Sequence, residues 1–217
     1  MKKNLTQLVF ILDRSGSMAG LESDTIGGFN AMLEKQKKED GECVITTVLF
    51  DHEVELLHDR IDIRAVKPMN EKEYTVRGST ALLDAIGKTI HKIGNVEKNT
   101  AEEYRAEKVM FVIITDGEEN SSRYYSLHAV KHMIERQKKR YGWEFIFLGA
   151  NIDAVQTAKY MGIEEDMAVD FVPDEAGVEL NFKMMSEAVA SFRACGKVSQ
   201  SSLNTIRKDM KKRGGRR

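Results

Sequence analysis

Short apolar runs alternate along this chain with longer segments in which apolar residues recur every three or four positions. The short runs predict buried strands, and the longer segments predict amphipathic helices. The expected strands lie at 8–12, 43–51, 54–63, 109–115, 143–150 and 167–172. The expected helices lie near 22–38, 83–93, 127–134, 153–161 and 178–192. This alternation predicts a doubly wound α/β fold, in which a mostly parallel central sheet carries helices on both faces.

The second and third expected strands are joined by a very short link. Only residues 51 to 53 separate the apolar part of one run from Val54, where the next begins. A hairpin can be that short, whereas a parallel connection needs a dozen or more residues. We therefore expect the third strand to be antiparallel and to lie at an edge of the sheet.

The size of the chain suits one domain. Its 217 residues are 41% hydrophobic, which is enough for one sizeable core without a second domain. We assign 1–200 to this single domain and 201–217 to a flexible basic tail, because 207–217 contain seven Lys or Arg and one acid, Asp209. A short basic terminus is more often solvated than bound. Nucleic acid is therefore not an expected partner, despite the local charge.

The N-terminal sequence is similar to a signal peptide only at first sight. The apolar stretch after the first lysines is interrupted by Asp13 and Arg14, and no small-residue cleavage site follows. No apolar run approaches the roughly 20 residues of a membrane helix, so no membrane contact is expected. Cys43 and Cys195 have neither metal nor redox spacing. We expect both thiols to stay reduced and the protein to be cytoplasmic.

Oxygen-bearing side chains follow two of the expected strands and precede one expected helix. The first strand ends at Asp13, and Ser15 and Ser17 follow in a D-x-S-x-S loop. Thr80 stands in a G-S-T turn just before the second helix, and the fourth strand ends at Asp116. Carboxylates and hydroxyls are ligands for hard cations such as Mg²⁺. Both carboxylates lie in one crevice if these two strands are neighbours where the strand order reverses.

These motifs, in this order, resemble those of the von Willebrand factor A family. The metal ion-dependent adhesion site (MIDAS) of that family consists of D-x-S-x-S, a Thr after a Gly-rich turn, and the Asp of a T-D-G segment. The resemblance runs from about residue 5 to residue 192 and implies a Rossmann-like sheet. It also implies that the two serines and Thr80 contact the cation, while Asp13 and Asp116 act directly or through water. The implied cation is Mg²⁺, with Mn²⁺ and Ca²⁺ as alternatives.

The resemblance implies a function in protein binding, either in adhesion or as an adaptor. In that family an Asp or Glu of a partner protein completes the coordination of the cation. The charge of the predicted ligands agrees with this role. Two carboxylates balance the charge of a divalent cation, and the three hydroxyls are neutral. Together they leave part of an octahedral shell for water or for an oxygen from outside. The partner itself cannot be named from these residues.

Two other functions are compatible with a strand-terminal aspartate. Mg²⁺-dependent phosphotransfer needs a second carboxylate two residues after Asp13, but that position is Ser15. No phosphate-binding or nucleophile motif occurs elsewhere, and His128 and His132 lack the glutamate of H-E-x-x-H. We therefore do not expect an enzyme. A scaffold in which the metal only joins loops is the other alternative.

Simpler structural roles also fit each of these positions. Ser15 and Thr80 are residue types that cap helices, and an Asp followed by Gly is common in turns. Arg14 either shields the cation, orients an acidic ligand, or is exposed without a role. Asn151 follows another strand and is a candidate for the crevice rim, whereas Asp153 is expected to cap the next helix. Glu118 and Glu119, next to Asp116, are expected to form a solvated acidic turn, the alternatives being that they raise the cation affinity or repel an acidic partner.

Overall fold

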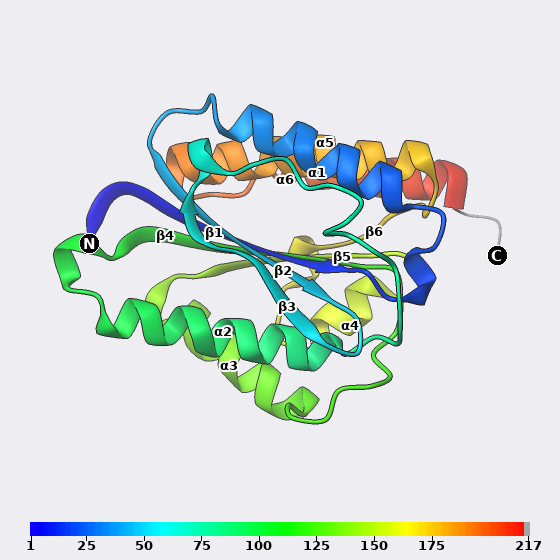
Figure 1. The fold of residues 1–217 in the computed structure, drawn as a ribbon, viewed down its shortest axis with the longest axis horizontal. Helices are drawn as coiled ribbons and strands as arrows, with labels where there is room; N and C mark the ends of the chain where they lie inside the picture. Colours follow the sequence, from blue (N-terminus) through cyan, green and yellow to red (C-terminus); the bar gives the residue numbers. More distant parts are fainter. Residues whose placement is uncertain (215–217) are drawn as a thin grey trace.

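A six-stranded sheet forms the centre of the computed structural model, which describes residues 1–214 (Figure 1). The strands are β1 (Lys2–Asp13), β2 (Glu42–Phe50), β3 (Val54–Asp62), β4 (Ala106–Thr115), β5 (Glu144–Gly149) and β6 (Ala168–Asp170). Their order across the sheet is β3-β2-β1-β4-β5-β6, and every neighbouring pair is parallel except β2 and β3. The predicted doubly wound fold with one antiparallel edge strand is confirmed.

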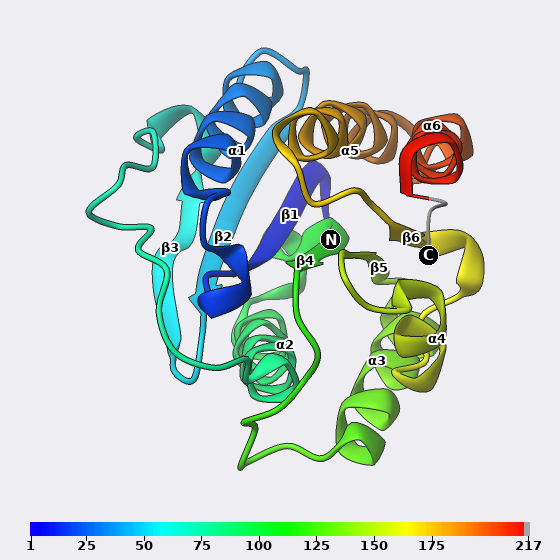
Figure 2. The same cartoon turned by 90° about the vertical axis from the view of Figure 1, so that its right-hand side faces the viewer.

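Helices cover both faces of this sheet. They are α1 (Glu22–Gln36), α2 (Leu82–Asn99), α3 (Leu127–Tyr141), α4 (Ala154–Tyr160), α5 (Glu175–Cys195) and α6 (Gln200–Asp209). Figure 2 shows α1, α5 and α6 on one face and α2, α3 and α4 on the other. The short helical turns are Gly16–Met18, Ile63–Ala65, Glu102–Tyr104, Glu165–Met167 and a π-helical turn at Met210–Gly214. No helix among residues 1–214 combines the length and apolar character needed to cross a bilayer.

Strand β1 contributes to both hydrophobic cores, which explains its unbroken apolar run. Leu8 and Phe10 pack in the core beneath α1 and α5, whereas Val9 and Ile11 pack in the core beneath α2 and α3. A strand covered on both faces needs apolar side chains at successive positions. The same reasoning accounts for the continuous apolar sequence of β4.

Local signals set several helix ends. Ser126 and Asp174 accept hydrogen bonds from the first turns of α3 and α5, and both helices end at a left-handed glycine, Gly142 and Gly196. Glycine is favoured there because a side chain makes positive φ costly. Asp153 caps α4, as predicted from the sequence.

The order of the strands reverses at β1. The chain runs from β1 outward to β2 and β3, and it then crosses through α2 to β4 on the other side of β1. The loops after β1 and β4 therefore leave the sheet in different directions at their carboxyl ends. This point is where ligands bind in open α/β sheets.

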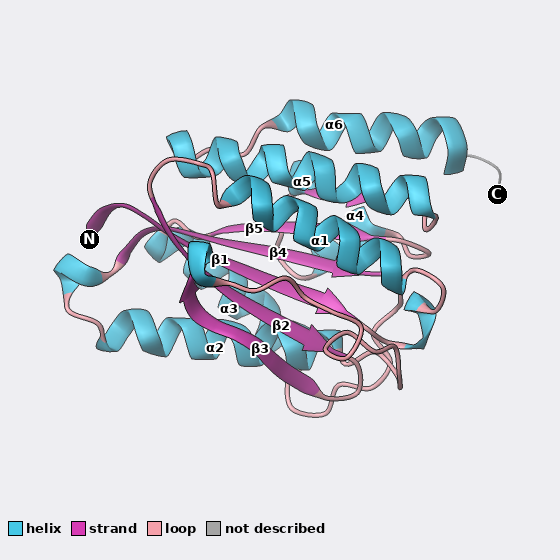
Figure 3. Cartoon of the chain, turned by 45° about the horizontal axis from the view of Figure 1, so that its top comes forward, coloured by secondary structure: helices cyan, strands magenta, loops and turns pink. Residues whose placement is uncertain are grey.

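The prediction of a flexible tail from residue 201 is wrong for the described part of that segment. Helix α6 packs beside α5 (Figure 3), and Leu203 and Ile206 are buried in the core. Arg207 donates hydrogen bonds to main-chain oxygens near β6, and Arg213 pairs with Asp174 and Asp209. The apolar face of α6 is short, so the charged residues around it obscured the helix in the sequence. Residues 215–217 of the predicted tail lie outside the described part of the chain.

Candidate metal centre

Three loops meet at the reversal of strand order. The first loop (14–21) follows β1, the second loop (66–81) precedes α2, and the third loop (116–126) follows β4. They carry four of the five side chains that the sequence predicts as metal ligands, and the fifth, Asp13, is the last residue of β1. The structure brings these side chains together from positions up to about a hundred residues apart in sequence.

The three predicted hydroxyl ligands are in contact. The Oγ atoms of Ser15 and Ser17 are 3.1 Å apart, and Thr80 Oγ1 donates to Ser15 Oγ over 2.9 Å. Gly117 comes so close that a Cβ atom on it would lie 3.0 Å from Ser17 Oγ and 3.1 Å from Thr80 Oγ1. The third loop can therefore approach the hydroxyls because this position has no side chain.

Neither Thr80 nor Ser15 caps a helix, which was the simpler structural role open to each. Thr80 does not cap α2, whose N-cap residue is Ala81 and has no side-chain hydrogen bond. Ser15 precedes the turn Gly16–Met18 but makes no side-chain cap either. Both hydroxyls instead point at each other, which supports a shared ligand as the reason for their positions.

Asp13 is buried and held from both sides. Its Oδ1 accepts the Ser15 N–H over 2.7 Å, and its Oδ2 accepts the Thr115 hydroxyl over 2.6 Å. Burial raises the pKa of Asp13 above its ordinary value, although these hydrogen bonds act in the opposite direction. Thr115 was not predicted as a site residue, and its place directly before Asp116 was the available signal.

Asp116 is the first residue after β4, and it is buried close enough to Asp13 to feel its charge. Burial raises its pKa to about 6, the side chain of Asn151 donates a hydrogen bond that lowers it, and the charge of Asp13 raises it further. Asn151 has a left-handed backbone (φ 54°). Its role is thus more specific than the predicted place on the crevice rim, because it orients one carboxylate oxygen of Asp116.

The donor set fits a divalent cation. Two buried carboxylates of like charge oppose each other's ionisation, and a cation between them would remove that cost. The three hydroxyls already contact one another, and the Ser15 N–H donates to the Asp13 carboxylate. Oxygen-only donors suit Mg²⁺, Mn²⁺ or Ca²⁺ rather than metals that prefer sulfur. That these five side chains bind a cation stays a prediction, but their geometry allows it.

The second loop is fixed by contacts that the sequence did not indicate. The Tyr74 hydroxyl donates to the main-chain oxygen of Asp13 at the end of β1. The side chain of Asn30 in α1 donates to the oxygen of Met69 and accepts its N–H, both over 2.8 Å. These bonds give a long loop without regular structure a defined path to Thr80.

The third loop is joined to the second loop and to α2. Asn120 accepts the Thr80 N–H over 2.9 Å and donates its own N–H to the Thr80 oxygen over 3.0 Å. Glu119 accepts the N–H of Leu83 in the first turn of α2 over 2.8 Å. A carboxylate is stabilised at a helix N-terminus by the unpaired N–H groups there. The prediction of a solvated acidic turn is therefore wrong for Glu119, which holds the loop against α2.

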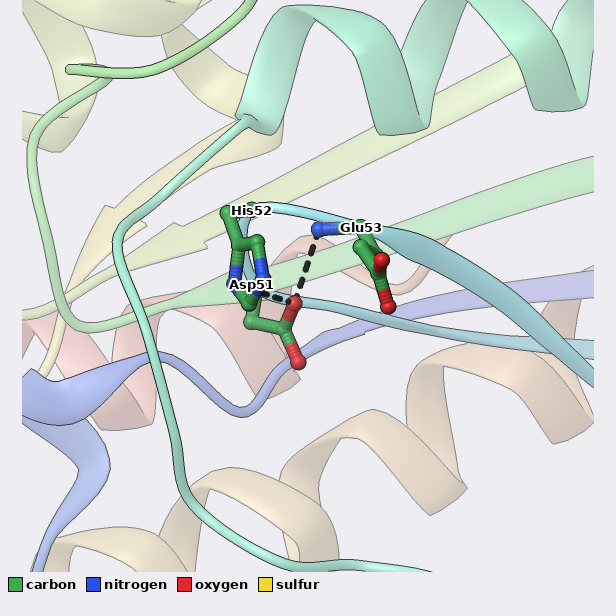
Figure 4. Close-up of side chains that lie close together, drawn as sticks. All are labelled: Asp51, His52 and Glu53. Atoms are coloured by element: carbon green, nitrogen blue, oxygen red, sulfur yellow. Dashed lines mark hydrogen bonds and ion pairs between the residues drawn. The ribbon is translucent and has the colours of Figure 1, made fainter.

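Arg14 is buried, so the predicted alternative of an exposed side chain without a role is wrong. Its side chain is only 2% exposed, and its Nε lies 3.0 Å from Oδ2 of Asp51, the residue after β2. Asp51 forms a group of ligand-type side chains with His52 and Glu53, shown in Figure 4. Because its carboxylate already pairs with arginine, this group is distinct from the predicted metal ligands.

The predicted histidine pair is remote from this chemistry. His128 and His132 are exposed on α3. Their position agrees with the interpretation of a solvated helix face.

Comparisons with known proteins identify the fold but not the activity. No protein-family model matches the sequence, and no curated protein sequence matches it. Among solved structures, a von Willebrand factor type A protein from Catenulispora acidiphila aligns with 85% of this chain and 42% of its own, at 14% identity and a TM-score of 0.58. Manganese-loaded TRAP protein from Plasmodium vivax aligns with 84% of this chain and 74% of its own, at 19% identity and a TM-score of 0.59.

A third similar structure is proximal thread matrix protein 1 from the mussel byssus, described with a zinc-occupied MIDAS motif. It aligns with 85% of this chain and 46% of its own, at 14% identity and a TM-score of 0.58. This chain thus spans less than half the length of the mussel and Catenulispora proteins. Identities this low establish the architecture alone. The strand order, the antiparallel edge and these likenesses show that the chain has the von Willebrand factor A fold.

Proposed function

We propose that this protein is a metal-dependent protein-binding module. A divalent cation bound by Asp13, Ser15, Ser17, Thr80 and Asp116 would capture an Asp or Glu side chain of a partner protein. The observation that carries the proposal is the convergence of two carboxylates and three hydroxyls, from the end of β1 and three loops, at the reversal of strand order. Mg²⁺ is the proposed physiological ion, and Mn²⁺ and Ca²⁺ fit the same donors.

The charge of the site supports capture of an acidic group. The protein supplies two negative charges, which balance the charge of the ion without exceeding it. Octahedral coordination leaves a position for water that a carboxylate can replace. The loaded metals named for the mussel and Plasmodium structures, zinc and manganese, also support a divalent ion in a site of this fold.

The phosphotransfer alternative has less support. A general acid or base would be expected two residues after Asp13, and that residue is Ser15, whose N–H donates to the Asp13 carboxylate. The cytoplasmic location stays a prediction as well. It is compatible with the free thiols of Cys43, which is buried, and Cys195, which is exposed.

The first experiment is calorimetric titration of Mg²⁺ and Mn²⁺ into metal-stripped protein. We expect saturable binding to a single site that is lost in Asp13→Ala. Asp62→Ala is the matched control, because Asp62 pairs with Arg64 on the surface and should leave binding unchanged. Absence of saturable binding in the native protein, or equal binding in Asp13→Ala, would contradict the proposal.

Water-proton relaxation of bound Mn²⁺ then separates capture of a ligand from a purely structural ion. A glutamate-containing peptide that coordinates the ion displaces its bound water and lowers the relaxivity. The same peptide with glutamine should leave the relaxivity unchanged. If neither peptide lowers it while Mn²⁺ still raises the melting temperature, the metal only joins the loops and the protein-binding proposal is wrong.

A further inference from the structure

A buried ion-pair cluster lies next to the predicted ligands. Asp51 directly follows β2, its side chain is 0% exposed, and it stands at the same edge of the sheet as Asp13. Figure 4 shows its carboxylate between the backbone of the β2–β3 turn and the neighbouring loops. A fully buried carboxylate is costly unless charged and polar groups surround it.

Each oxygen of Asp51 has two partners. Oδ2 accepts the Nε–H of Arg14 over 3.0 Å and the Nε–H of Arg77 over 2.8 Å. Oδ1 accepts the Glu53 N–H over 2.7 Å and lies 3.0 Å from His52 Nδ1. A single oxygen therefore joins Arg14 of the first loop to Arg77 of the second loop.

Main-chain hydrogen bonds join the same two loops. The Arg77 N–H donates to the Arg14 oxygen over 2.9 Å, and the Gly16 N–H donates to the Gly78 oxygen over 3.0 Å. Asp51 also contacts the end of the second loop, because its main-chain oxygen accepts the Ala81 N–H over 2.8 Å. The loops that carry Ser15 and Thr80 are thus bound to each other and to the end of β2.

The sequence also limits the side chains that fit between these loops. A Cβ atom on Gly78, which has φ 69°, would lie 2.2 Å from His52 Nδ1. A Cβ atom on Gly16 would lie 3.3 Å from the Gly78 oxygen. A side chain at position 78 would therefore clash with the β2–β3 turn, and one at position 16 would press against the second loop.

The ion pair with Asp51 also neutralises the charge of Arg14. Arg14 is next to Asp13 in sequence, and a buried guanidinium would repel a cation nearby unless it were neutralised. Asp51 neutralises it, and Glu55 adds a contact of 2.7 Å to Arg14 Nη2. Burial raises the pKa of Asp51, but hydrogen bonds from Arg77 and Glu53 and the charge of Arg14 outweigh it and hold the pKa below its ordinary value.

We infer that Asp51 is a positioning residue for the metal site. It does not bind the cation, but through Arg14 and Arg77 it sets the separation of the loops that carry Ser15 and Thr80. The inference rests on the proposed function for its metal, while the joining of the loops by Asp51 can be tested without metal.

The experiment compares Asp51→Asn with Asp62→Asn, the same substitution in the same hairpin. In metal-stripped protein we expect the amide protons of Gly16 and Arg77 to exchange with solvent at least tenfold faster in Asp51→Asn, and at the native rate in Asp62→Asn. Exchange of β4 amides reports whether the fold is intact. Unchanged protection of Gly16 and Arg77 would overturn the inference.

Mn²⁺ titration of the same variants gives the second measurement. We expect Asp51→Asn to bind Mn²⁺ at least tenfold more weakly than the native protein and Asp62→Asn to bind equally well. If the native protein and Asp51→Asn bind Mn²⁺ with equal affinity, the inference is overturned and the proposed function stands. Failure of the native protein to bind would instead overturn the proposed function.

Arg77→Gln keeps the test decisive if Asp51→Asn does not fold. The Arg77 side chain is 47% exposed, so its loss should not disrupt the core. We expect faster exchange of the Gly16 amide and Mn²⁺ binding weakened several-fold. Arg77→Lys, which keeps the charge, should recover part of the affinity. Native behaviour of Arg77→Gln in both measurements would contradict the inference.

Discussion

At the level of single residues, Asp13 and Asp116 are two buried carboxylates whose negative charges disfavour each other. Asp116 has a pKa of about 6 because burial and the charge of Asp13 disfavour its charged form. In the unfolded chain Asp116 has its ordinary pKa of about 4. Between about pH 4 and pH 6, folding therefore takes up a proton at this carboxylate. This contribution to stability is present below about pH 4 and is lost as the pH rises through about 6.

We predict that Asp116→Asn stabilises the metal-free protein at neutral pH relative to the native chain. The free energy of unfolding of the variant should gain on that of the native protein by about 2 kcal/mol between pH 4 and pH 7, because the variant has no charge to bury. Urea unfolding of both proteins across this range measures the difference. The variant should also fail to bind Mn²⁺.

His58 also makes the free energy of unfolding depend on pH, so the native protein and Asp116→Asn must be compared with each other. It is 8% exposed, and burial lowers its pKa while Glu73 opposes the shift. Its contribution to stability is therefore lost as the pH falls below its ordinary value of about 6.5, which is the opposite direction. Because both proteins contain His58, subtraction removes it. A pH-independent difference would contradict the ionisation described for Asp116.

The five candidate ligands could be predicted because motif chemistry is local in sequence. The residues that hold them could not, except where they adjoin a motif. Thr115 stands beside Asp116, but Tyr74 lies in a segment without a recognisable pattern, and Asp51 ends an expected strand with no motif around it. Their contacts depend on which strand ends become neighbours in the sheet, and this information is not present in any short window of sequence.

At the level of elements, two adjacent glycines in α1 have different surroundings. A Cβ atom on Gly27 would meet nothing within 4 Å, whereas one on Gly28 would lie 2.4 Å from the ring of Phe182 in α5. Gly28 therefore sets how closely α1 and α5 pack. Gly27 has no such constraint and only lowers the helix propensity.

We predict opposite effects of the same substitution at these positions. Gly27→Ala should raise the free energy of unfolding by about 0.5–1 kcal/mol, the gain expected inside a helix. Gly28→Ala should lower it by about 1–2 kcal/mol, because the new methyl group overpacks the interface with Phe182. Denaturant unfolding of both variants tests this, and equal effects would contradict the described packing of α1 on α5.

Most elements lie close to their predicted bounds because apolar periodicity reports burial directly. Apart from α6, the first strand is the main difference, since it begins at Lys2 rather than near residue 8. Asn4 has φ 61°, and the pairing of β1 with β4 changes register between Lys2 and Thr6. This irregular start has no apolar pattern, so it could not be recognised in the sequence.

For the whole molecule, α6 completes the core on the α5 face. Leu203 is 0% exposed and Ile206 is 2% exposed. Burying an aliphatic side chain of this size contributes about 1.5–3 kcal/mol. Loss of both is a large fraction of the 5–15 kcal/mol that stabilises a typical domain.

We predict that a chain ending at residue 199 is less stable than the full chain by at least about 3 kcal/mol, since apolar surface of α5 loses its cover. In the full chain, Leu203→Ala should cost about 2–5 kcal/mol. Thr205→Ala, at an exposed position of the same helix, is the control and should change little. A native melting temperature in the truncated chain would mean that α6 is not part of the folded core.

The sequence by itself determined the types and order of the elements up to α5, the antiparallel edge strand and the five candidate ligands. Each of these follows from local properties, namely apolar period, link length and the chemistry of neighbouring side chains. Only the tertiary structure decided that Asp51 joins two loops through arginines, that Asn151 orients Asp116, and that α6 belongs to the core. These contacts join residues far apart in the chain, and they exist because the reversal of strand order at β1 brings separate loops to one edge of the sheet.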